Sequence, residues 1–98
     1  MHIRVEQSGG IAGLRSSHEL DTAQLPDELR EPIVHLVERL SFFGLAPESL
    51  TRMPDATCYR VRIEDGARAH EVTCDDGAAD TGLLELVERV TALARAQG

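Results

Sequence analysis

The side chains in this sequence with the widest chemical use are four histidines and two cysteines. The histidines are widely separated along the chain: His2, His18, His35 and His70. His70 and Cys74 have the four-residue spacing of the zinc-binding motif H-E-x-x-H, but a cysteine replaces the second histidine and the segment is predicted to be a strand. Positions i and i+4 of a strand lie about 13 Å apart, which is too far to share one ion. The pattern therefore predicts no metal site.

The candidate nucleophiles also lack the surroundings that catalysis requires. Ser8, Ser16 and Ser17 are not part of a G-x-S-x-G elbow. Cys58 lies on a predicted strand, without the helix N-terminus or cationic pocket that lowers the pKa of a thiol. The glycine-rich segment 8–13 matches neither phosphate-binding motif and precedes a predicted strand instead of a helix. We therefore expect no catalytic residue, no cofactor and no enzyme activity.

Composition and charge exclude further classes of protein. The formal net charge is −7, and arginine is the only formal cation because lysine is absent. An acidic surface repels phosphate backbones, so we expect no nucleic-acid partner. No apolar run approaches the length of about 18 residues that a membrane span needs, and none resembles the core of a signal peptide. Two cysteines and no export signal predict a cytoplasmic protein without disulfides.

The elements that must position these residues are predicted to form two successive halves, each with two strands followed by a helix. Residues 1–98 are predicted to form a single domain. Ile3 and Val5 alternate with charged residues and predict a strand. A second strand is predicted, and one of its faces consists of Leu14, Ser16, His18 and Leu20, the other of Arg15, Ser17 and Glu19. Its register is poorly specified, because one face is not clearly apolar. A helix follows, with Pro32 near its start and Gly44 as its predicted C-cap. Its expected apolar stripe consists of Leu29, Ile33, Leu36, Val37 and Leu40.

The second half repeats this order after a predicted loop over residues 44–56. Tyr59, Val61 and Ile63 alternate with charged residues, and Asp65-Gly66 predicts a two-residue hairpin turn that would place Tyr59 opposite Val72. Cys58 and Cys74 then point to opposite faces. The last helix begins at Asp80-Thr81, and its expected apolar stripe consists of Leu83, Leu86, Val87, Val90, Leu93 and Ala94. The expected fold is α+β, in the order ββαββα, with a four-stranded antiparallel sheet and both helices on one face.

The connection between the first two strands contains three glycines within five residues. One interpretation is structural: a bulge or a sharp bend in the sheet. The other is functional: small residues let the backbone approach a partner closely, with Ile11 or Leu14 as an apolar anchor.

Several short motifs in this order resemble the emfourin family, the protein inhibitors of protealysin-like proteases. The matching segments are Ile3-x-Val5-x-x-Ser8-Gly9-Gly10-Ile11-Ala12-Gly13, Leu20-Asp21-Thr22, Leu25-Pro26, Phe42-Phe43, Tyr59-x-Val61-x-Ile63-x-Asp65-Gly66, His70-x-Val72 and Asp75-Asp76-Gly77. Each segment alone is weak, but their order and spacing cover nearly the whole chain.

The resemblance implies inhibition of a thermolysin-like zinc metalloprotease without any cofactor. The expected contact loop consists of Ser8, Gly9, Gly10, Ile11, Ala12, Gly13 and Leu14. A second contact is expected at Asp75, Asp76 and Gly77 or in the loop 44–56, because protease–inhibitor interfaces bury about 1,600 Å². The alternative is a non-catalytic adaptor or dimerisation module that packs through its open sheet face, where Tyr59, Arg60 and Arg62 would matter more than the glycines. A long, exposed apolar face would favour this alternative, and a charged face would favour the loop. A monomer or a weak homodimer is expected.

Overall fold

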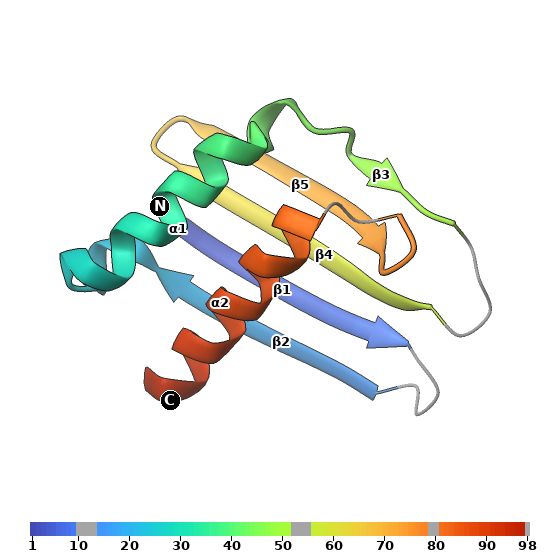
Figure 1. The fold of residues 1–98 in the computed structure, drawn as a ribbon, viewed down its shortest axis with the longest axis horizontal. Helices are drawn as coiled ribbons and strands as arrows, with labels where there is room; N and C mark the ends of the chain where they lie inside the picture. Colours follow the sequence, from blue (N-terminus) through green and yellow to red (C-terminus); the bar gives the residue numbers. More distant parts are fainter. Residues whose placement is uncertain (10–13, 52–55, 79–80, 98) are drawn as a thin grey trace.

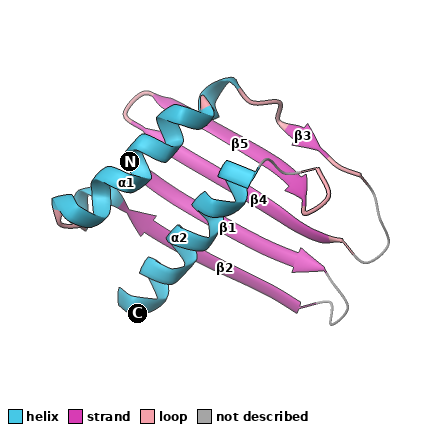
Figure 2. Cartoon of the chain, in the orientation of Figure 1, coloured by secondary structure: helices cyan, strands magenta, loops and turns pink. Residues whose placement is uncertain are grey.

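A twisted sheet with two helices against one of its faces forms the molecule (Figure 1). The computed structural model describes residues 1–9, 14–51, 56–78 and 81–97. The strands are β1 (His2–Gly9), β2 (Leu14–Asp21), β3 (Glu48–Ser49), β4 (Thr57–Asp65) and β5 (Arg68–Asp75). The helices are α1 (Asp27–Leu40) and α2 (Thr81–Gln97), with short 3₁₀ turns η1 (Thr22–Gln24) and η2 (Phe42–Gly44). Figure 2 distinguishes the two kinds of element along the chain.

The sheet is mixed and has the strand order β2-β1-β4-β5-β3. The prediction of four antiparallel strands was correct for β1, β2, β4 and β5. It missed β3, which pairs in parallel with β5 inside the segment that was predicted to be a loop. Two residues are too short to show the period-2 alternation by which a strand is recognised.

The core lies between the sheet and the helices. Alternate residues of the long strands point into it, such as Ile3 and Val5 of β1 and Val61 and Ile63 of β4, all at most 1% exposed. On β2 the face that contains Leu20 points into the core, since Leu20 is buried and pairs with Ile3. The helices contribute a further set of buried side chains: Ile33, Leu36, Val37, Leu83, Leu86, Val87 and Val90.

The β4–β5 hairpin has a different register from the predicted one. Asp65 pairs with Arg68, so Gly66 and Ala67 form the turn and Tyr59 lies opposite Cys74, not Val72. Gly66 adopts a φ of +61°, which a residue without a Cβ tolerates well. A shift of two residues preserves the faces of a strand. Cys58 and Cys74 therefore still lie on opposite faces, and both are free thiols.

Helix α1 departs from its predicted pattern at both ends. Its first residue is Asp27, so Pro32 lies inside the helix as expected. Leu29 is 42% exposed and does not belong to the buried stripe, because the helix turns this first apolar position outward. The C-cap is Ser41, with a left-handed φ of 51°, and not Gly44. Gly44 instead ends the following turn η2, which places Phe42 in the core. Neither described helix has the length and apolar character needed to cross a membrane.

The face of the sheet opposite the helices carries mostly charged and polar side chains. Ion pairs link neighbouring strands across it, including Arg4–Glu19 at 3.7 Å and Arg60–Glu6 at 3.4 Å. These side chains are largely exposed, so each pair stabilises the fold by only about 0–1 kcal/mol. A charged face lacks the apolar area that association through it would bury. It therefore favours the contact-loop hypothesis over the adaptor hypothesis.

Candidate functional site

The two predicted contact segments flank the same end of the sheet. Gly9, at the end of β1, pairs with Leu14 of β2 on one side and with Thr57 of β4 on the other. Cys58, the next residue of β4, pairs with Asp75 at the end of β5. Figure 1 shows these strand ends side by side. We call the described residues at this end the rim: Ser8, Gly9, Thr51, Ala56, Thr57, Asp75, Asp76 and Gly77.

The predicted contact loop is described only at its two ends. Ser8 and Gly9 complete β1, and Leu14 begins β2. The predictions for Gly10, Ile11, Ala12 and Gly13 lie outside the described residues. Because Gly9 and Leu14 pair with each other, the backbone is fixed on both sides of this four-residue connection.

Gly9 has a backbone that requires glycine. Its φ is +89°, and a Cβ placed on it would lie 3.0 Å from the carbonyl oxygen of Ala56. Such an approach is closer than most contacts that Cβ atoms make in proteins, and because the oxygen belongs to the backbone, a side chain here would require the chain itself to shift. Gly9 thus lets β1 end directly against the segment that leads into β4. The fold therefore gives a structural reason for one of the three clustered glycines, independently of any partner.

Asp75 holds two segments of the rim together. Its side chain is buried, at 1% exposure, at the end of β5. One carboxylate oxygen accepts hydrogen bonds from the backbone N–H and the hydroxyl of Thr51, at 2.7 and 2.8 Å. The other accepts from the N–H groups of Gly77 and Ala78, at 3.2 and 2.9 Å. The carboxylate therefore fixes the chain after β3 and the turn after β5 in one arrangement.

Asp76 and Gly77 are the exposed part of this turn. The N–H of Asp76 donates to the carbonyl of Thr57 at 3.0 Å, which ties the turn to the first residue of β4. Three residues were predicted as a second contact. Asp75 is buried and holds the turn in place through its hydrogen bonds, whereas Asp76 and Gly77 are exposed to solvent. Thr51 and Ala56 were not singled out individually, since only the fold brings them to the rim.

A shallow hollow lies beside the rim on the charged face of the sheet. It encloses about 410 Å³, and its lining includes Ser8, Arg15, Cys58 and Arg60. The lining also contains Arg4 and the carboxylate of Glu6, so arginines outnumber acidic residues and the hollow suits a polar or acidic group of a partner better than an apolar one.

The remaining reactive side chains have structural surroundings. Burial raises the pKa of the Cys74 thiol to about 11, with smaller contributions from Asp75 and Cys58. The thiolate, which is the nucleophilic form, is therefore suppressed at neutral pH. His70 Nε2 lies 2.8 Å from the carbonyl oxygen of Leu45, and its ring packs edge-on against Phe42. Among the described residues, no three histidine, cysteine or acidic side chains gather closely enough to bind a metal ion.

Comparison with known proteins identifies a family whose sequence pattern this chain matches. The family model described as Emfourin matches residues 5–91, which is nearly the whole chain. The match includes the rim, α1 and the first part of α2. No curated protein and no solved structure gives a significant match.

Proposed function

Since this chain belongs to the emfourin family, which is a family of protease inhibitors, we propose that it inhibits a zinc metalloprotease of the thermolysin or protealysin type. The connection between β1 and β2, residues Ser8–Leu14, would enter the active-site cleft of the enzyme. The inhibition is steric and needs no reaction on the inhibitor. Membership in an inhibitor family also agrees with the expectation that the chain is not an enzyme.

The observation that carries this proposal is the convergence of both expected contact segments on one rim. Gly9 pairs with Thr57, and Thr57 accepts a hydrogen bond from Asp76. A partner that binds the connection after Gly9 would therefore also meet Asp76 and Gly77. A standard protease–inhibitor interface buries about 1,600 Å² in total, which a single short connection cannot supply. A rim formed by several segments offers a partner more contact area than the connection alone.

Rigidity of the flanks is the second support. The connection continues from β1, which has a paired strand on each side. Asp75 adds buried hydrogen bonds that hold the neighbouring segments. Binding by preformed segments avoids much of the cost of ordering a free peptide, so the affinity of such a loop exceeds that of its isolated sequence.

We also propose a reducing, cytoplasmic location. Its support is the presence of two free thiols, one of them half-buried at Cys58 and the other buried at Cys74. Proteins of oxidising compartments more often carry their cysteines as disulfides.

The test is a titration of thermolysin and of a protealysin-like enzyme with this protein, measured on a small peptide substrate. We expect stoichiometric loss of activity. Replacement of Ile11→Asp should raise the inhibition constant by about tenfold or more, because a charge would replace an apolar anchor. The thermal midpoint should hardly change.

Leu29→Asp is the matched control, since it places the same charge on an exposed leucine of α1. This variant should inhibit as the wild type does. Equal inhibition by the Ile11→Asp variant would remove the connection from the interface. Full activity of both enzymes at saturating wild-type inhibitor would refute the proposed class of target.

A further inference from the structure

Strand β2 forms one edge of the sheet along its whole length of eight residues. Its described pairing is with β1 alone. The opposite edge is protected differently, because β3 there is only two residues long. A long edge strand presents unpaired N–H and C=O groups to which another strand can add. Neither proline nor lysine, which commonly block such addition, occurs in β2.

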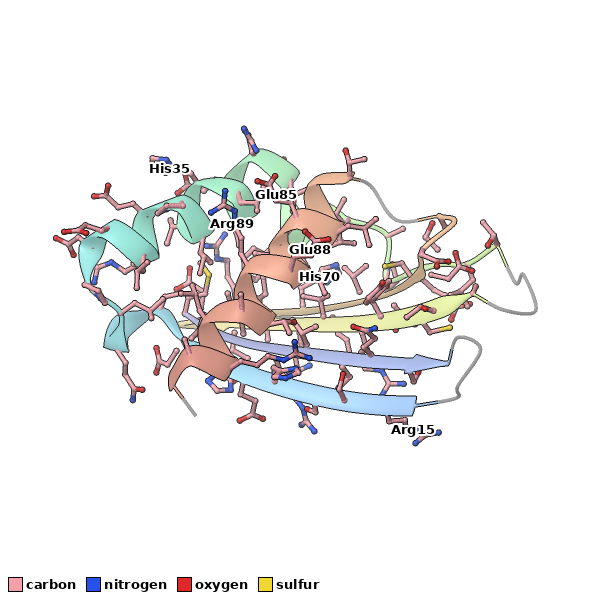
Figure 3. The ribbon with its side chains drawn as sticks, turned by 60° about the horizontal axis from the view of Figure 1, so that its bottom comes forward. Arg15, His35, His70, Glu85, Glu88 and Arg89 are labelled. Atoms are coloured by element: carbon pink, nitrogen blue, oxygen red, sulfur yellow. The ribbon has the colours of Figure 1, made fainter. Side chains whose placement is uncertain are left out.

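The side chains on the outer face of this edge are suited to a second copy of the same strand. Arg15 and Glu19 both belong to the outer face, since they pair with Ser8 and Arg4 of β1. Figure 3 shows Arg15 projecting from the sheet on the side away from the helices. Two antiparallel β2 strands related by a two-fold axis at Ser17 would place Arg15 of each copy opposite Glu19 of the other.

Both charged groups are available for this contact. Within the described part of the chain, the side chain of Arg15 makes no hydrogen bond or ion pair that would hold it elsewhere. The Glu19 side chain is 54% exposed, and its carboxylate lies 3.7 Å from Arg4 Nε and 3.7 Å from His2 Nε2. These are long contacts, so the carboxylate can accept a closer guanidinium. Opposite charges that face each other across antiparallel strands attract.

We propose that the free edge of the sheet along β2 is a self-association site, at which two copies pair through their β2 strands and form one continuous sheet. The register is restricted, because a slip of one residue would set core-facing side chains against solvent-facing ones. An axis at His18 would place Arg15 opposite Asp21, whose carboxylate already accepts a hydrogen bond from the N–H of Ala23. An axis at Ser16 would place Arg15 opposite the uncharged Ser17. The axis at Ser17 satisfies both charges.

Sedimentation equilibrium over a wide range of concentrations tests the proposal. The wild type should show a reversible monomer–dimer equilibrium. Arg15→Glu and Glu19→Arg each turn two attractive pairs into repulsive ones, so each should raise the dissociation constant of the dimer by about tenfold or more. The double variant Arg15→Glu/Glu19→Arg restores opposite charges in exchanged positions and should recover the dimer.

Arg62→Glu is the control, since Arg62 lies on the same face of the sheet but on the inner strand β4. It should leave the dissociation constant unchanged, and a circular dichroism spectrum checks that each variant is folded. A wild type that stays monomeric at the highest concentration, or a double variant no stronger than the single ones, would overturn the proposal. Dissociation by Arg62→Glu would do so as well, because it would move the contact from the edge to the open face.

Discussion

At the scale of single residues, Gly9 shows how the fold constrains the segment next to the proposed contact loop. Its positive φ and the 3.0 Å approach to the Ala56 carbonyl both oppose a side chain. Gly9→Ala should lower the free energy of unfolding by about 1–2 kcal/mol, the cost of a left-handed conformation for an L-residue. Gly44→Ala is the control, because no atom lies within 4 Å of its added Cβ. Urea denaturation of both variants measures the difference, and equal midpoints would contradict this account.

Asp75 and Asp76 allow a comparison between a buried and an exposed carboxylate at adjacent positions. Asp75→Asn leaves a single acceptor oxygen, so either the two donors of Thr51 or the N–H groups of Gly77 and Ala78 lose their acceptor. Loss of buried hydrogen bonds of this kind should lower the free energy of unfolding by about 1–3 kcal/mol. Asp76→Asn, at the adjacent exposed position, should change it by less than about 0.5 kcal/mol. Thermal unfolding of the two variants distinguishes a buried positioning carboxylate from a surface one.

The Cys74 thiol predicts a pH dependence above neutrality. Its pKa is about 11 in the folded protein against a usual 9.0. The unfolded chain therefore loses this proton first, and the free energy of unfolding should fall as the pH rises from 9 to 11 but not below 9. The effect is of the order of 1 kcal/mol. Cys74→Ala should show a smaller fall between pH 8 and pH 10.5 in urea denaturation, and an identical fall would exclude this thiol as the source.

At the scale of elements, the periodicity of the sequence predicted most of the fold. Alternation of apolar and charged residues identified β1 and β4, and the 3.6-residue stripe identified α2, whose predicted positions Leu83, Leu86 and Val90 are buried. The predicted hairpin register was wrong because either Asp65-Gly66 or Gly66-Ala67 can form the two-residue turn, and both pairs supply a glycine to it. β3 was missed because its two residues show no alternation and pair with residues of β5 that lie 25 positions further along the chain.

Helix α1 contains a proline that its packing does not need. Pro32 is exposed, lies six positions into the helix and cannot donate a hydrogen bond to the carbonyl of Glu28. Pro32→Ala should raise the free energy of unfolding by about 1–3 kcal/mol, since it restores a donor and loses no buried contact. His35→Ala, on an exposed position of the same helix, is the control and should change stability little. A thermal midpoint that falls in Pro32→Ala would contradict this expectation.

At the scale of the whole molecule, the arrangement of the strands was the part that local patterns could not predict. The two ββα halves are joined by the pairing of β1 with β4, two strands that are separated in the chain by every element from β2 to β3. This pairing brings Gly9 to Thr57 and thereby creates the rim. The sequence predicted both contact segments separately. Their convergence depends on which strands become neighbours, and several strand orders would satisfy the same apolar patterns.

The pairing of β1 with β2 also bears on how such a protein would survive contact with a protease. The two strands are held together along all eight residues of each, up to Gly9 and Leu14. A cut within residues 10–13 would therefore leave both new chain ends fixed to one sheet, so the cleaved product could not diffuse away as a peptide does. Dissociation of the two pieces would require the pairing of β1 with β2 to open along all eight residues of each strand. The strand pairing therefore keeps a nicked chain in one piece.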